Sequence, residues 1–151
     1  MSGCAGCGPS RRAILKGGAA GIVLAAAPAA CTSQPGAPSG PIMAGNVSAV
    51  PVGTLEVLTE LAVVLGRDDG GLYAMSAVCT HAGCVVGVLS GDSGKSLRCG
   101  CHGSTFDADG AVTMGPAMTA LRHYEVDLGD DGTITIRGDV AVAADARTPV
   151  P

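Results

Sequence analysis

Short hydrophobic runs separated by turn sequences dominate the chain after residue 46. None of them keeps the 3.6-residue spacing of an amphipathic helix, and most are rich in residues that favour strands, such as Val, Leu, Ile and Thr. The turns between them combine Gly with Asp or Ser. The pattern therefore predicts an all-β domain. Its expected strands are Val47–Val50, Leu55–Leu58, Leu61–Leu65, Leu72–Val78, Val85–Leu89, Ser96–Arg98, Leu121–Leu128 and Thr133–Arg137.

Two segments flank this pattern. Residues 32–45 begin with TSQPGAPSGP, a Pro-, Gly- and Ser-rich sequence with nothing to bury, and we expect a linker there. Residues 139–151 follow the last expected strand and are predicted to form a flexible tail. The folded domain is therefore expected to be a single one that covers residues 46–138.

The first 31 residues have the pattern of an export signal. Arg11 and Arg12 lie in the sequence SRRAILK, which precedes 14 weakly apolar residues, Gly17–Ala30. This resembles a twin-arginine signal, S-R-R-x-F-L-K, with Ile14 where Phe is common. Because a membrane span needs about 20 apolar residues, the run favours a cleaved signal over a permanent anchor.

Cysteines at the N-terminus leave the processing of this signal open. Cys31 ends the apolar run as in a lipoprotein processing site, where the cysteine is acylated, which would place the mature protein at the membrane surface. The small residues at 27–29 offer a competing cleavage site. Cys4 and Cys7 form a C-x-x-C ahead of the signal, with no second pair nearby, and we expect them to leave with it.

The amino-acid composition limits the size of the hydrophobic core and the classes of molecule that the chain can bind. The chain has three aromatic residues and 24 glycines, so its core is thin, and small domains of this kind are usually fastened by disulfides or a metal. Seven cysteines supply the means. Beyond the signal, six basic residues stand against thirteen acidic ones, a formal charge of −7. This argues against nucleic acid as a partner, because phosphate binding needs a basic patch.

Two loops with the same set of cysteine and histidine residues contain the candidate metal ligands. Cys79–Cys84 reads CTHAGC and Cys99–Ser104 reads CGCHGS, so each loop offers two cysteines and one histidine. Seventeen residues separate His81 from Cys99, enough for a hairpin that returns the second loop beside the first. Paired Cys and His sets of this kind indicate a metal centre.

These loops resemble the two boxes of the Rieske iron–sulfur family, C-T-H-x-G-C and C-x-C-H-G-S. The resemblance extends over about residues 46–138 and implies a Rieske-type antiparallel β-sandwich with a cluster-binding subdomain made of two loops. It implies one 2Fe–2S cluster, with Cys79 and Cys99 on one iron and His81 and His102 on the other. Neutral imidazoles in place of two thiolates raise the reduction potential above that of all-cysteine clusters.

The resemblance further implies a disulfide between the remaining box cysteines, Cys84 and Cys101. Chain entropy suggests roughly 3 kcal/mol of stabilisation for the loop that this bond would close. A disulfide also suits an exported protein. It separates this chain from the ferredoxins and oxygenase domains of the Rieske superfamily, which generally lack the pair.

Other positions are implied to tune the cluster. Ser104 would donate a hydrogen bond to a bridging sulfide, which favours the reduced form. Phe106 stands where quinol-oxidising members commonly carry a Tyr that hydrogen-bonds a ligand sulfur, which points to a lower potential. Gly115 and Pro116 resemble the proline loop that covers the cluster and limits water. His123 is expected to be a surface strand residue without a role.

Two other classes of site compete with this interpretation. Two Cys and two His also suit tetrahedral zinc, but zinc sites usually show C-x(2–4)-C pairs, and zinc leaves Cys84 and Cys101 unexplained. A dithiol oxidoreductase using Cys99 and Cys101 would want a helix N-terminus to lower the thiol pKa, and the β pattern provides none.

The sequence thus predicts one-electron transfer without substrate chemistry of its own. We expect an exported carrier, or a small subunit of an envelope oxidoreductase, with a cytochrome or an oxidoreductase large subunit as redox partner. The alternative is the Rieske subunit of a cytochrome bc-type quinol oxidase complex. The short apolar run, the small size and Phe106 argue against that alternative. The arginine pair, the disulfide cysteines and the C-T-H-x-G-C box argue for it.

Overall fold

The computed structural model describes residue 36 and residues 38–91 and 94–151. The expected export signal, with Arg11, Arg12 and Cys31, and linker residues 32–35 and 37 lie outside this range. No helix in the described part is long and apolar enough to span a membrane. The elements are β1 Pro41–Asn46, η1 Val47–Ala49, β2 Thr54–Leu58, η2 Thr59–Leu61, β3 Val63–Asp68, β4 Gly71–Ser76, β5 Val86–Gly91, β6 Gly94–Cys99, β7 Thr105–Phe106, β8 Val112–Met114, β9 His123–Leu128 and β10 Thr133–Val142, where η marks a single 3-10 turn.

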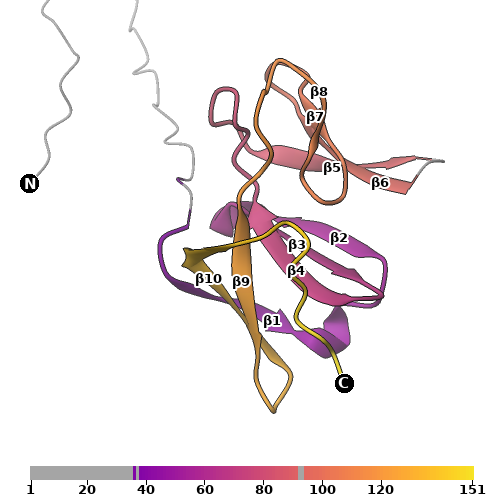
Figure 1. Ribbon diagram of the computed structural model, residues 1–151, viewed down its shortest axis with the longest axis vertical. Helices are drawn as coiled ribbons and strands as arrows, with labels where there is room; N and C mark the ends of the chain where they lie inside the picture. Colours follow the sequence, from indigo (N-terminus) through magenta and orange to yellow (C-terminus); the bar gives the residue numbers. More distant parts are fainter. Residues whose placement is uncertain (1–35, 37, 92–93) are drawn as a thin grey trace, which may run out of the picture. The chain divides into compact units, whose positions relative to one another are not determined.

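The strands form two antiparallel sheets (Figure 1). The base sheet has six strands in the order β1-β10-β9-β4-β3-β2. The second sheet has four strands in the order β5-β6-β7-β8, and we call it the loop sheet because the two Cys/His loops adjoin it. The predicted all-β, antiparallel architecture is confirmed.

Two hydrophobic cores account for this arrangement. Successive residues of a strand point to opposite faces, and in β3 the side chains of Val63 and Leu65 join one core while Val64 joins the other. The core that contains Val64 also takes in Leu97 and Phe106 of the loop sheet. The base sheet is therefore covered on both faces, and the loop sheet packs on one of them.

The N-terminal edge of the domain differs from expectation. Val47–Val50 was expected as a strand, but Val47–Ala49 forms a 3-10 turn that starts at Asn46, whose side chain accepts a hydrogen bond from the N–H of Ser48. The strand lies just before it, as β1, and pairs with β10 inside the range expected to be linker. A Pro at the first position of an edge strand is compatible with pairing, so the Pro/Gly-rich composition hid a strand.

The C-terminal segment also differs from expectation. Residues 139–151 were predicted to be a flexible tail, but β10 continues to Val142, and it pairs with β9 on both sides of an irregularity between Arg137 and Ala141. Further on, Thr148 exchanges two backbone hydrogen bonds with Leu72 of β4, at 2.9 and 2.8 Å. Backbone pairing holds this segment, and backbone pairing leaves little trace in the sequence pattern. The folded part thus extends beyond residues 46–138 on both sides.

Candidate metal centre

The first Cys/His loop is closed by its own backbone. The N–H of Cys79 donates to the carbonyl of Cys84 at 2.8 Å, and the N–H of Gly83 donates back to the carbonyl of Cys79 at 2.9 Å. An antiparallel bridge between Val78 and Val85 flanks the loop. Gly83 has φ +78°, a left-handed conformation that glycine adopts without strain. Main-chain bonds and one glycine therefore fix the shape of the loop.

The second loop repeats the first, position by position. The N–H of Cys99 donates to the carbonyl of Ser104 at 2.8 Å, and the N–H of Gly103 donates to the carbonyl of Cys99 at 3.0 Å. The flanking pair here is Arg98 and Thr105, and Gly103 has φ +80°. The two loops therefore share the same backbone hydrogen bonds and the same positive-φ glycine position, and they present different side chains.

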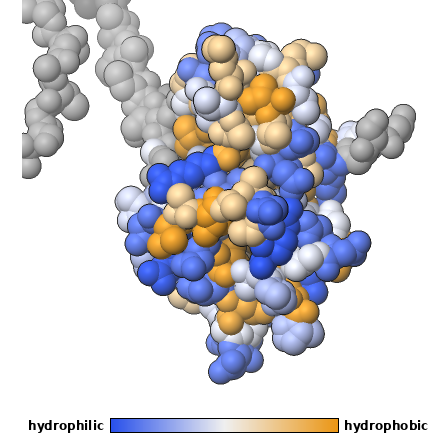
Figure 2. Space-filling model, in the orientation of Figure 1, coloured by the Kyte–Doolittle hydropathy of each residue, from blue (hydrophilic) through white to orange (hydrophobic). Residues whose placement is uncertain are grey.

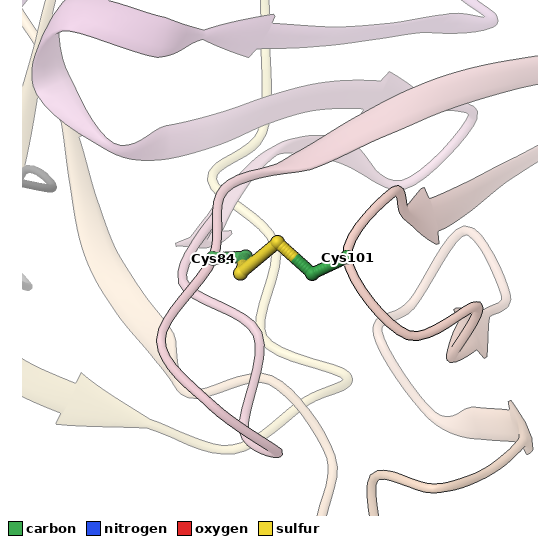
Figure 3. The surroundings of a disulfide bond; sticks show 2 residues. All are labelled: Cys84 and Cys101. Atoms are coloured by element: carbon green, nitrogen blue, oxygen red, sulfur yellow. A yellow bond between two sulfur atoms is a disulfide. The ribbon is translucent and has the colours of Figure 1, made fainter.

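A disulfide joins the two loops (Figure 3). Cys84 and Cys101 are bonded, with an S–S distance of 2.07 Å and Cα atoms 6.5 Å apart. The pairing that the family resemblance implied is confirmed. The bond draws the two loops together, and it leaves Cys79 and Cys99 as thiols without a disulfide partner in the described part of the chain.

The four remaining donors divide between the interior and the surface. Cys79 and Cys99 are each 2% exposed, whereas His81 and His102 are exposed. The centroids of the two imidazole rings lie 4.8 Å apart, edge to face. Two buried thiols and two adjacent imidazoles are the donor set that a Rieske 2Fe–2S cluster requires, so the residues fit that group.

One nearby group of sulfurs is not a ligand set. The Sγ atoms of Cys84, Cys99 and Cys101 all lie within 4.8 Å of one another. Two of them belong to the disulfide, however, and a metal ligand must be a thiolate. The group therefore shows how close the disulfide lies to one of the free thiols.

The chain around the Gly115–Pro116 bond, which is cis, is tied to both loops. The N–H of Ala117 donates to the hydroxyl of Ser104 at 2.9 Å. The hydroxyl of Thr80, in the first loop, donates to the carbonyl of Thr119 at 2.6 Å. The sequence pointed to Ser104 and the proline loop but gave no signal for Thr80, because hydroxyl-to-carbonyl contacts across 39 residues have no sequence pattern.

Ser104 is fully buried, and the hydrogen of its hydroxyl group is not used in the bond to Ala117. The oxygen accepts from Ala117, and within the described residues the hydroxyl donates to no protein acceptor. A buried donor without an acceptor is costly. A sulfur acceptor of a bound cluster would satisfy it, which is a second respect in which the site fits that group.

Phe106 is also fully buried. It pairs with Leu97 of β6 and lies in the same hydrophobic core as Cys79 and Cys99. The ring therefore belongs to the apolar wall behind the two thiols. Its predicted influence on the cluster stays a prediction.

The segments that surround the four donors lack charged side chains. The two loops and residues 113–120 contain no Asp, Glu, Lys or Arg, although the chain as a whole has a formal charge of −4. Met114 is 63% and Met118 93% exposed beside the proline loop. On the face drawn in Figure 2, hydrophobic and weakly polar residues occupy part of the lobe that β5–β8 form. We call this surface, made by the two loops and residues 113–120, the tip.

His123 is not the surface residue that the sequence predicted. It is 3% exposed, and its Nε2 atom lies 2.8 Å from the carbonyl oxygen of Asp109. The residue begins β9, an interior strand of the base sheet, and is paired with Met75 on the face on which the loop sheet packs. There it contacts the turn between β7 and β8 through Asp109. That contact involves residues distant in sequence, so the strand pattern alone could not reveal it.

Known proteins resemble the chain in these features. The family model described as Rieske [2Fe-2S] domain matches residues 41–125. The cytochrome b6-f complex iron-sulfur subunit of Prochlorococcus marinus (strain MIT 9515) is 40% identical over 72 residues, which are 48% of this chain and 39% of that protein. Its counterpart in Chlorobaculum tepidum is 34% identical over 94 residues, 61% of this chain and 50% of that protein. The chain thus spans half or less of the length of these curated relatives.

A solved structure agrees on the fold. It is titled as the complex of reduced oxygenase and oxidized ferredoxin in carbazole 1,9a-dioxygenase, and one of its chains matches with a TM-score of 0.50 at 21% identity, over 68% of this chain and 97% of that chain. The family model covers more than half of the chain, including both loops. With the matched fold, the disulfide and the fitting donor set, these findings show that the chain belongs to the Rieske [2Fe-2S] domain family, whose cofactor is one 2Fe–2S cluster.

Proposed function

We propose that this chain is an exported one-electron carrier, or a small subunit of an envelope oxidoreductase, and that Cys79, His81, Cys99 and His102 hold its cluster. The observation that carries the proposal is the division of the donors into two buried thiols and two exposed, adjacent imidazoles. When bound, the cluster supplies a centre that accepts and releases one electron.

The residues around the centre bury its thiol side in the apolar core and leave its imidazole side exposed to solvent. The apolar core encloses the two thiols, and the chain after β8 is tied to both loops by Ser104 and Thr80. The two imidazoles lie at the surface. Electrons would therefore enter and leave through the imidazole edge, because the two imidazoles are exposed while the two thiols are buried.

The absence of charged residues from the tip indicates what surface its redox partner presents. Steering by charge needs opposite charges near the contact, and the tip contributes none, whereas exposed apolar side chains favour contact with an apolar face. The partner, a cytochrome or the large subunit of an oxidoreductase, is expected to present an apolar socket to the tip. Binding should then depend only weakly on salt.

The Rieske subunit of a quinol-oxidising cytochrome complex remains a second candidate, because the relatives named above are subunits of the cytochrome b6-f complex. Phe106, in place of the usual Tyr, favours the carrier. An experiment that separates the two candidates adds purified protein and a reduced quinol analogue to membranes that contain a cytochrome b partner. If an inhibitor of quinol oxidation stops reduction of the iron–sulfur cluster, the result favours the second candidate.

Export is part of the proposal and rests on the sequence pattern around Arg11 and Arg12. The disulfide supports it, because such bonds persist in oxidising compartments. Changing both arginines to Lys should retain the precursor inside the cell, and unchanged export would mean another route. Labelling of mature protein with palmitate would show acylation at Cys31, whereas a soluble form that begins near Ala30 would favour the competing cleavage site.

The ligand assignment is tested on the purified full-length chain. Wild-type protein should be coloured and give a rhombic electron paramagnetic resonance signal with two irons per chain, whereas a zinc protein would be colourless. The His102→Ala variant should lose both the signal and the iron. Arg137→Gln is the control, since it changes an exposed residue of the base sheet away from both loops and should leave the iron content intact. A full signal in His102→Ala would refute the assignment.

A further inference from the structure

The hairpin of β7 and β8 has two functional ends. At one end, Ser104 precedes β7 and the proline loop follows β8, and the N–H of Ala117 joins them by its bond to the Ser104 hydroxyl. At the other end lies the turn Asp107–Gly110, whose backbone bond from Gly110 to Asp107 measures 3.1 Å. Asp107 lies three positions after Ser104, so the two ends are roughly 10 Å apart at the rise of a strand.

Three side chains from outside the loop sheet hold this turn. The hydroxyl of Tyr73, on β4, donates to the carbonyl of Ala108 at 3.2 Å. The imidazole of His123, on β9, bonds the carbonyl of Asp109 at 2.8 Å. The guanidinium of Arg147, in the C-terminal segment, donates to the carboxylate of Asp109 at 2.5 Å. We call these three residues the clamp.

Arg147 ties the clamp together. Its Nε–H donates to the carboxylate of Asp68 at 2.6 Å, and its guanidinium stacks on the Tyr73 ring, 4.1 Å from the centroid. The Tyr73 ring in turn stacks on His123, with centroids 6.4 Å apart and an angle of 18° between the planes. The Arg147 side chain is only 15% exposed. It is therefore held from several sides, unlike an ordinary surface arginine.

We propose that the clamp positions the proline-loop end of the hairpin through the turn, and that Arg147 is a positioning residue for the electron-transfer site. The hairpin is short, and both of its ends are bonded, so release of the turn loosens the Ser104–Ala117 bond at the opposite end. The inference rests on the proposed function, because it assigns the role of Arg147 through the environment of the cluster.

Two substitutions separate positioning from simple electrostatics. Arg147→Gln removes a positive charge, and Asp109→Ala removes a negative one. If the pair acts only through its charges, the first lowers the reduction potential of the cluster and the second raises it. If the pair acts as a clamp, both variants weaken the same contact at Ser104, and both lower the potential. Voltammetry of the cluster-loaded full-length protein measures the two shifts.

A second readout does not depend on the potential. Hydrogen exchange of the Ala117 amide reports the bond to Ser104 directly. In both variants we expect exchange about tenfold faster, which corresponds to ~1.4 kcal/mol of lost protection. Arg147→Lys keeps the charge but lacks the planar fork, and it should resemble Arg147→Gln.

Two variants serve as controls. Arg137→Gln breaks an exposed ion pair with Asp127 on the base sheet, and it should change neither the potential nor the exchange of Ala117. Asp145→Ala removes an exposed carboxylate that lines the same cavity as Arg147, so it measures the bare effect of charge. Shifts of opposite sign in Arg147→Gln and Asp109→Ala, with normal exchange at Ala117, would overturn the clamp while leaving the proposed function intact. A wild-type chain without an iron–sulfur signal would instead refute the proposed function.

Discussion

The hydroxyl of Ser104 accepts a hydrogen bond from the backbone N–H of Ala117 at 2.9 Å. One side chain of the second Cys/His loop thereby holds the proline loop in place. Because the oxygen accepts this bond, the single hydroxyl proton is directed elsewhere, and both groups are buried. Ser104 thus has a structural role and an expected electronic one, and the two roles can be measured separately.

Ser104→Ala should lower both the stability and the reduction potential. It leaves the N–H of Ala117 buried without an acceptor, at a cost of about 1–3 kcal/mol. It also removes a donor that would favour the reduced, more negative state of the site. Denaturant titration and voltammetry measure the two effects. Ser76→Ala, which deletes another buried hydroxyl that accepts a backbone N–H, should cost stability with a smaller change in potential.

Phe106→Tyr should raise the potential. If the ring reaches a ligand sulfur, the new hydroxyl donates to it, and a differential of about 1 kcal/mol for a bond to a charged group corresponds to roughly 40 mV for one electron. Phe106→Leu is the control, because it changes the packing without adding a donor. A fall in stability without any change in potential would place the ring away from the sulfurs, since the buried hydroxyl would then have no acceptor.

Loss of the disulfide should destabilise the domain before it removes iron. The bond closes a loop of 17 residues, so the Cys84→Ser variant should lose about 3 kcal/mol of unfolding free energy. Denaturation with and without reductant measures this, and reductant should have no further effect on the variant. Mass spectrometry that finds both thiols free in exported wild-type protein would contradict the bridge.

Acid should weaken the contact between Asp68 and Arg147. Partial burial of the Asp68 carboxyl raises its pKa, but hydrogen bonds from Arg147 and from the N–H groups of Gly70 and Gly71 outweigh it, and the net pKa is lowered. A carboxyl whose pKa is lower in the folded state stabilises the fold above the unfolded pKa, about 3.9. This contribution is lost as the pH falls through the folded pKa.

The corresponding experiment compares Asp68→Asn with the wild type across pH. The Asp68 side chain is 43% exposed, so the difference in unfolding free energy should be at most about 1 kcal/mol near neutral pH, and it should disappear in acid. High salt should reduce it as well. A difference that persists unchanged once the pH has fallen through the folded pKa would show that the contribution does not come from the ionised carboxyl.

The family and the disulfide could be predicted from the sequence, because the residues that indicate them are local. The proposed ligands, the disulfide cysteines and Ser104 all lie within two six-residue loops, where Cys, His and Gly stand at fixed spacing. The strands with alternating or continuous apolar residues, such as β3 and β4, were also predictable from their pattern.

What the sequence could not reveal depends on contacts between distant residues. His123 is buried because a turn of the other sheet covers it, and Arg147 is held by Asp68 and Asp109, 79 and 38 residues away. The edge strand β1 was hidden by its composition, because its pairing partner β10 supplies the hydrogen bonds. In each case the deciding interaction involves backbone atoms or a partner that no local window contains.

The equivalence of the two Cys/His loops also bears on how such a site can evolve. The bonds that close each loop use main-chain atoms and one glycine, so loop closure places no demand on the side chains at the third and fourth positions, although Cys101 at the third position of the second loop is also fixed by the disulfide. In the first loop the histidine occupies the third position, as His81, and in the second loop the fourth, as His102, with Cys101 at the third. Selection can therefore exchange or shift a ligand within either loop, and so change the electron affinity of the protein, without altering the scaffold that presents it.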